Sequence, residues 1–65
     1  MASVVAKRRE LRLSQRKFAE RFGIAWQTYA QWETGKRQPD QTAQVLLKVI
    51  VNSPLMVEAV VKEGK

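Results

Sequence analysis

The stretch SQRKFAERFGIAWQTYAQWETG, residues 14–35, predicts two short helices joined by a tight turn. Ser14 is a residue type that caps the N-terminus of a helix through its side-chain oxygen. The apolar residues that follow share one helical face, and these are Phe18, Ala19 and Phe22. Gly23 then ends the helix, because a residue without a Cβ freely adopts left-handed geometry.

The second helix of this stretch is expected from about Trp26 to Thr34, ending at Gly35. At about 100° per residue, Tyr29 and Trp32 fall about 60° apart, so both are expected in the core. The opposite side carries Trp26, Gln27, Ala30, Gln31 and Thr34. A core alone therefore does not account for the large ring of Trp26.

Helix signals continue through the rest of the chain, and no segment alternates with the period of two that a half-buried strand shows. Ser3 predicts the cap of a first helix reaching about Arg12. Asp40 predicts the cap of a fourth helix, which carries Val45, Leu46, Val49 and Ile50. Ser53 and Pro54 begin a fifth helix that fades at Gly64. The expected fold is all-α, with five helices in a single domain spanning residues 1–65.

The composition favours a binding protein over an enzyme. The chain has no cysteine and no histidine, so the usual thiolate nucleophile, zinc ligand and general base are missing, and no cofactor is expected. No apolar run approaches the roughly 20 residues of a membrane span. We therefore expect a cytoplasmic protein with no membrane partner.

The positive charge is confined to one part of the chain. The formal net charge is +6 and the pI is about 10.4, and both favour an acidic partner such as nucleic acid. Residues 1–37 hold nine basic and three acidic residues, whereas residues 38–65 are neutral and rich in Val and Leu. This division predicts a binding half, with the helix-turn-helix at about 14–35, and a packing half at about 40–63.

Two helices of this length joined through a glycine form a helix-turn-helix, whose second helix fits the major groove of DNA. The longer run LSQRKFAERFGIAWQTYAQWETGKRQP, from Leu13 to Pro39, resembles the XRE/Cro family of DNA-binding domains. The ending WETGKRQP and the later LLKVI are most similar to HigA-like antitoxins and related stand-alone repressors. The resemblance implies a compact lambda-repressor-like domain of five helices that binds double-stranded DNA as a homodimer on an inverted repeat, in a bacterium or phage.

The resemblance also implies roles for matching positions. The residues expected to contact base edges are Trp26, Gln27, Thr28 and Gln31. Those expected at phosphates are Gln15, Arg16, Thr34, Lys36 and Arg37. Arg8 and Glu33 match a pair that forms an ion pair between the first and third helices in some members.

Three positions depart from the family pattern. Ala25 stands where a Ser or Thr cap is common, so the third helix lacks a contribution of about 1 kcal/mol. Lys7 occupies a position that is usually apolar, and we expect Val4 or Val5 to supply that core contact instead. Tyr29 is bulkier than the usual Ile or Val, which predicts a somewhat different angle between the second and third helices.

Each candidate contact has a plainer alternative. Trp26 could fold over its own helix, although its apolar face and single N–H suit a thymine methyl or a sugar. Gln27 and Gln31 could be solvated residues, yet an amide can pair with adenine through two hydrogen bonds. Arg9 and Arg12 could equally form a solvated face with no phosphate near.

The fifth helix is apolar around most of its circumference, whereas covering a core needs one apolar stripe. A symmetric dimer would bury the second side and would place two recognition helices about one DNA turn apart. The residues predicted at this interface are Leu55, Met56, Val57, Val60 and Val61. The alternatives are simple exposure of some valines, or a longer parent chain.

These observations favour a homodimeric, sequence-specific DNA-binding repressor. The main alternative is an antitoxin whose first task is to bind a toxin protein, and against it we expect no additional toxin-binding segment before the first helix. Single-stranded nucleic-acid binding is a weaker hypothesis, because one exposed aromatic residue makes a thin stacking platform. No group of residues supports an enzyme.

Overall fold

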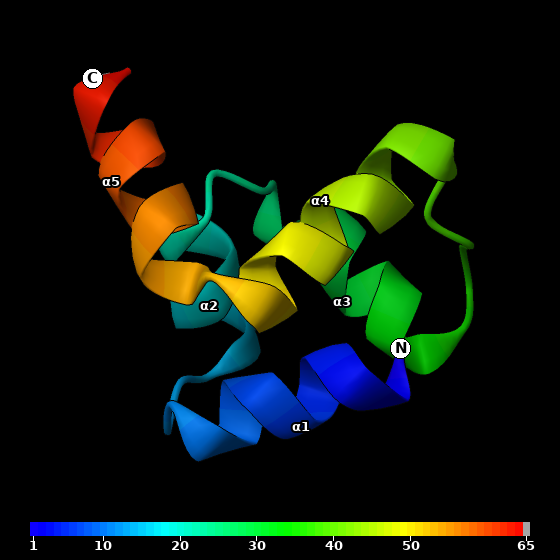
Figure 1. Cartoon of the computed structure of the whole chain (residues 1–65). Helices are drawn as coiled ribbons and strands as arrows, with labels where there is room; N and C mark the ends of the chain where they lie inside the picture. Colours follow the sequence, from blue (N-terminus) through cyan, green and yellow to red (C-terminus); the bar gives the residue numbers. More distant parts are fainter. Residues whose placement is uncertain (65) are drawn as a thin grey trace.

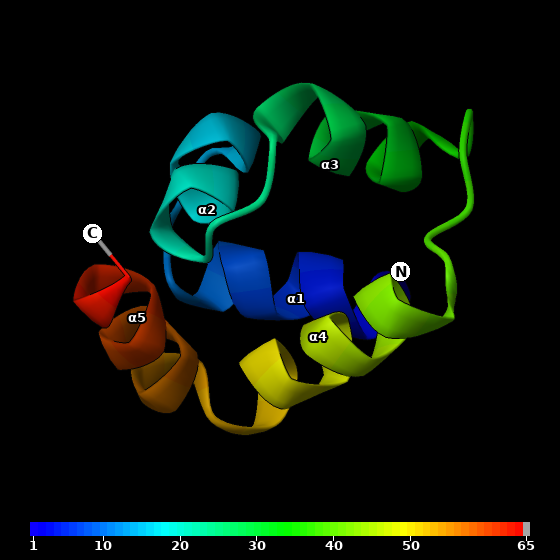
Figure 2. The same cartoon turned by 90° about the horizontal axis from the view of Figure 1, so that it is seen from above.

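The computed structural model describes residues 1–64 and contains five helices in this part of the chain. The helices are α1 (Ala2–Glu10), α2 (Gln15–Arg21), α3 (Trp26–Thr34), α4 (Gln41–Asn52) and α5 (Pro54–Glu63). Helix α2 packs against α3, α1 against α4, and α4 against α5 (Figure 1). Viewed from above, α2 and α3 lie on one side of the molecule, and α4 and α5 lie on the other (Figure 2). The all-α prediction is confirmed.

Two predicted helix caps are confirmed. The Ser14 hydroxyl accepts a hydrogen bond from the backbone N–H of Lys17 at 3.1 Å, and Asp40 Oδ1 accepts one from Ala43 at 2.8 Å. Each satisfies one of the N–H groups that the first turn of a helix leaves without a partner.

The predictions at the first and fifth helices were partly wrong. Helix α1 begins before Ser3, because the Met1 carbonyl already accepts from the N–H of Val5 at 2.9 Å, so Ser3 lies inside the first turn and caps nothing. Ser53 precedes α5 but makes no side-chain cap. Pro54 follows it at the first turn, where the missing N–H leaves no donor unsatisfied.

Helix α1 also ends earlier than predicted, at Glu10. Arg12 has a left-handed φ of 59°, which turns the chain, and the backbone closes with Arg12 N–H donating to the Arg9 carbonyl and Leu13 N–H donating to the Arg8 carbonyl. This is a Schellman ending with arginine at the position where glycine is usual.

The core is a single apolar cluster to which all five helices contribute side chains. Its buried residues are Val4, Phe18, Ala19, Phe22, Tyr29, Leu47, Ile50 and Val57. Phe18 lies at its centre, with its ring centroid 4.8 Å from that of Phe22 and 5.1 Å from that of Tyr29. Trp32 packs against the cluster and meets the edge of Tyr29. The predicted burial of Tyr29 is therefore confirmed, and Val4 supplies the contact that Lys7 cannot.

Helix α4 buries only part of its apolar surface. Of the four apolar residues named from the sequence, Ile50 is fully buried and Leu46 packs against the core, whereas Val45 and Val49 are exposed. Leu47 is buried instead, three residues before Ile50. Packing against α1 on one side and α5 on the other selects the stripe through Leu47 and Ile50, which are neighbours on the helix surface.

No single helix within residues 1–64 is long and apolar enough to cross a membrane. Helices α4 and α5 reach that length and composition only as a pair, and the pair is bent by 116°.

Candidate nucleic-acid interface

The turn between α2 and α3 is fixed by two small residues. Gly23 has a left-handed φ of 74°, and the N–H of Ile24 donates to the Ala19 carbonyl at 2.8 Å. Ala19 is completely buried between the helices, where its single methyl allows their close approach. A Cβ on Gly23 would lie 3.3 Å from a methyl of Val61 in α5, so α5 also packs against this turn.

Helix α3 presents one buried side and one free side. Tyr29 is fully buried, whereas Trp26 is 43% exposed at the first position of the helix. Gln27 is exposed, and Thr28 and Gln31 are half-buried. The four residues predicted to contact bases therefore all retain accessible surface on this helix, which lies along an outer edge of the molecule (Figure 2). Ala25 makes no side-chain cap, so the first turn keeps unsatisfied N–H groups.

Glu33 anchors the inner edge of α3 to the first two helices. Its carboxylate accepts hydrogen bonds from Arg8 Nε at 2.8 Å and from a second Arg8 nitrogen at 3.2 Å, which makes a bidentate ion pair between α1 and α3. Tyr29 Oη donates to the same carboxylate, as does Gln15 Nε2 at 2.9 Å. Arg8 also donates to the Leu13 carbonyl at 2.9 Å. One buried carboxylate thus joins α1, α2 and α3.

The ionisation of this network follows from its contacts. Burial alone would raise the pKa of Glu33, but hydrogen bonds from Arg8, Tyr29 and Gln15 outweigh burial and hold that pKa below its ordinary value. The hydrogen bond to Glu33 raises the pKa of Arg8. Burial, followed by the hydrogen bond to Glu33, raises the pKa of Tyr29 far above its ordinary value. At neutral pH the network therefore contains a carboxylate, a guanidinium and a protonated phenol.

Gln15 lies at the first position of α2 with its amide already engaged by Glu33. The amide nitrogen carries two N–H groups, so one remains for another acceptor. The contact of Gln15 with Glu33 is not among the predicted contacts, and it joins two residues that are 18 positions apart in the sequence.

Arg16 and Trp26 meet across the turn. The Arg16 guanidinium carbon lies 5.8 Å from the centre of the Trp26 ring, within the range of a cation–π contact. Arg16 Nε also donates to Glu20 Oε1 at 3.2 Å, one helical turn further along α2. Nothing in the local sequence pattern signals the Arg16–Trp26 contact, since it depends on the angle between α2 and α3.

The loop after α3 holds exposed cations. Lys36 and Arg37 are both exposed, and within residues 1–64 neither forms an ion pair. Gly35 has a φ of 82°, and the N–H of Arg37 donates to the Gln31 carbonyl at 3.3 Å, which fixes the start of the loop against α3. The Thr34 hydroxyl donates to the same carbonyl at 3.2 Å.

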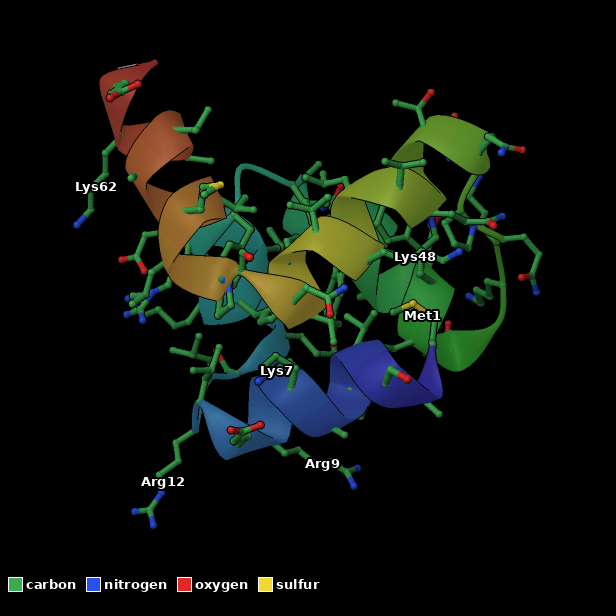
Figure 3. All side chains as sticks on the ribbon, in the orientation of Figure 1. Met1, Lys7, Arg9, Arg12, Lys48 and Lys62 are labelled. Atoms are coloured by element: carbon green, nitrogen blue, oxygen red, sulfur yellow. The ribbon has the colours of Figure 1, made fainter. Side chains whose placement is uncertain are left out.

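Two further arginines lie outside the predicted contact set. Arg9 on α1 and Arg12 in the turn after it are exposed and project away from the rest of the domain (Figure 3). Lys7, in contrast, pairs with Glu10 at 3.1 Å.

The structure corrects the predicted surface of α5. Val57 is only 8% exposed and belongs to the core, and Val61 packs against that core beside Gly23. Val57 therefore faces the domain and not a partner, and Val61 is partly buried, because packing against the rest of the chain sets the phase of the helix. The outward side instead carries Leu55, Met56 and Val60, which are 80%, 66% and 61% exposed.

Comparison with known families agrees with this geometry. A family model described as helix-turn-helix, HTH_3, matches residues 5–47, which is well over half of the chain and includes all of α2 and α3. No curated protein and no solved structure matches the chain. In helix-turn-helix motifs the second helix, here α3, is the one that enters the major groove of DNA. The chain belongs to the XRE-type helix-turn-helix family HTH_3 and is a DNA-binding domain of a transcriptional regulator.

Proposed function

We propose that the protein is a repressor that binds an inverted-repeat DNA operator as a homodimer through the free side of α3. The observation that carries this proposal is the free side itself. It combines an exposed aromatic ring with accessible amides, and exposed cations lie at both of its ends. A helix that fits the major groove can place the polar groups of one face at base edges. Cations beside that face can contact phosphates.

The base contacts are assigned to Trp26, Gln27, Thr28 and Gln31. Gln27 and Gln31 are one helical turn apart, so their amides can reach neighbouring base pairs. An amide offers an adjacent donor and acceptor, which match the N7 and N6 groups of adenine. The Thr28 hydroxyl adds a donor and acceptor at the edge of this face.

The phosphate contacts are assigned to Gln15, Arg16, Thr34, Lys36 and Arg37. Gln15 retains a free N–H while Glu33 fixes its orientation. Lys36 and Arg37 contribute charge from the loop, and Arg16 does so from α2. Such contacts provide affinity that falls with salt and does not depend on sequence. The Thr34 hydroxyl first has to leave the Gln31 carbonyl.

The dimer contact is assigned to the outward side of α5. Leu55, Met56 and Val60 form an exposed apolar strip there, and monomeric proteins rarely leave such strips uncovered. A second copy would cover it symmetrically. In that arrangement two α3 helices would meet successive turns of the major groove, about 34 Å apart.

Binding selection on random duplex DNA tests the proposal. We expect enrichment of an inverted repeat, with half-sites about one helical turn apart. Enrichment of single half-sites would contradict the dimer, and no enrichment at all would contradict sequence-specific repression. If a toxin rather than a second copy covers the α5 strip, as the antitoxin alternative requires, the purified protein alone will stay monomeric.

A further inference from the structure

We propose that Trp26, held in place by Arg16, selects a 5-methyl pyrimidine, thymine in ordinary DNA, at one position of each half-site. The inference rests on the proposed function, because it concerns the same face of α3. It adds a specificity-determining residue, Trp26, and a positioning residue, Arg16.

Trp26 differs from every other aromatic residue of the chain in its surroundings. Phe18, Phe22 and Tyr29 are buried, and Trp32 packs against the core. Trp26 alone is exposed, although burying a ring of this size is worth more than burying almost any other side chain. It stands at the first position of α3, at the end of the helix nearest to α2.

Arg16 restricts the ring to a defined orientation. Its guanidinium lies over one face of the Trp26 ring at 5.8 Å, and Glu20 holds the same guanidinium at 3.2 Å. Glu20 and Arg16 are one turn apart on α2, and their exposed ion pair limits the positions of the guanidinium without removing it from solvent. Arg16 therefore lies against one face of the indole, and part of the apolar surface of the ring stays accessible.

The chemistry of that open surface decides what it can select. An indole has one N–H donor and no acceptor, so it cannot match the two-point hydrogen-bonding pattern of guanine or adenine. The apolar feature of the major groove is the C5 methyl of thymine, which cytosine lacks. A ring held by Arg16 therefore favours thymine over cytosine by burying this methyl.

The test uses the operator obtained by selection, with each thymine replaced in turn by deoxyuridine. This replacement removes only the methyl group. For the wild-type protein we expect one symmetric pair of positions at which deoxyuridine weakens binding by about fourfold per half-site, the effect typical of one buried methyl-sized group. At those positions 5-methylcytosine should bind better than cytosine.

Variants assign the effect to the two residues. Trp26→Ala should bind the thymine and deoxyuridine operators equally, and Trp26→Phe should keep part of the preference. Arg16→Ala should reduce the thymine-to-deoxyuridine ratio, and Arg16→Lys should restore part of it because an ammonium also makes a cation–π contact. Arg21→Ala is the matched control, since Arg21 is on the same helix but pairs with Glu58 of α5, and it should leave the ratio unchanged.

The outcomes separate this inference from the proposed function. An enriched operator whose deoxyuridine effects are the same in wild type and Trp26→Ala overturns the inference and leaves the repressor proposal standing. A ratio that Arg16→Ala and Arg21→Ala change equally overturns the positioning role of Arg16. The absence of any enriched sequence overturns the proposed function, and the inference with it.

Discussion

At the scale of single residues, Glu33 is the shared acceptor of a hydrogen-bond network. Its side chain is 8% exposed and accepts hydrogen bonds from three helices, while its partner Arg8 is 14% exposed. Glu33→Gln leaves the Arg8 guanidinium mostly buried and without its counter-charge. We expect this change to lower the free energy of unfolding at pH 7 by about 3 kcal/mol, as measured by urea denaturation.

The same residue predicts a pH dependence. The folded-state pKa of Glu33 is lowered, so its contribution is fully present above the unfolded pKa of about 4.5 and is lost as the pH falls through the folded value. The stability gap between wild type and Glu33→Gln should therefore narrow in acid. The exposed Glu20→Gln serves as a control and should change stability by no more than about 0.5 kcal/mol. Wild-type and Glu33→Gln curves that stay parallel from pH 7 to pH 3 would refute this account.

At the scale of an element, the end of α1 carries a backbone cost. Arg12 holds a left-handed φ of 59°, a conformation that costs a residue with a Cβ about 1 kcal/mol and costs glycine almost nothing. Arg12→Gly should therefore raise the free energy of unfolding by about 1 kcal/mol in thermal or urea denaturation.

Arg9→Gly removes the same charge from within α1 and is the matched control for Arg12→Gly. It should lower stability by roughly 0.5–1 kcal/mol, because glycine is unfavourable inside a helix. If both variants lose stability alike, the arginine conformation at position 12 is not strained.

We expect residues of helix α3 to make sequence-specific contacts with DNA and residues of the loop that follows to make non-specific contacts. Gln27→Ala and Gln31→Ala should each weaken binding to the selected operator by about 1–3 kcal/mol while leaving binding to random DNA nearly unchanged. Arg37→Ala should weaken binding to all sequences similarly and reduce the salt dependence by about one unit. Titrations of both DNAs at several salt concentrations measure these effects. Equal losses on random DNA would exclude the two glutamines from base contacts, and an unchanged salt slope would exclude Arg37 from phosphate contacts.

At the scale of the whole molecule, a valine-to-glutamate substitution is expected to have different effects on the two sides of α5. Val60 is 61% exposed, so Val60→Glu should leave the subunit folded, separate the dimer and abolish cooperative binding to the full inverted repeat. Val57 is 8% exposed, so Val57→Glu should unfold the domain by placing a carboxylate in the core. Circular dichroism and sedimentation at tens of micromolar, with and without operator, measure both effects. A wild type that stays monomeric alone and binds one half-site without a second copy would rule out the dimer.

The sequence by itself determined the features that depend on neighbours a few residues away. The caps at Ser14 and Asp40, the left-handed glycines at positions 23 and 35, and the shared face of Phe18 and Phe22 all follow from local backbone geometry and helical spacing. These features are sufficient to identify a helix-turn-helix, so the fold and the free side of α3 could be predicted.

Only the tertiary structure decided the features that join distant segments. The buried stripes of α4 and α5 could not be predicted, because a helix that is apolar on several sides has no preferred phase until its neighbours fill one of them. Leu47 and Val57 are buried, and Val49 and Val60 are not, since α1 and the turn at Gly23 occupy one side of these helices. The hydrogen bond from Gln15 to Glu33 and the contact of Arg16 with the Trp26 ring likewise depend on the angles at which helices cross. Those angles result from the packing of the whole core, which no local pattern contains.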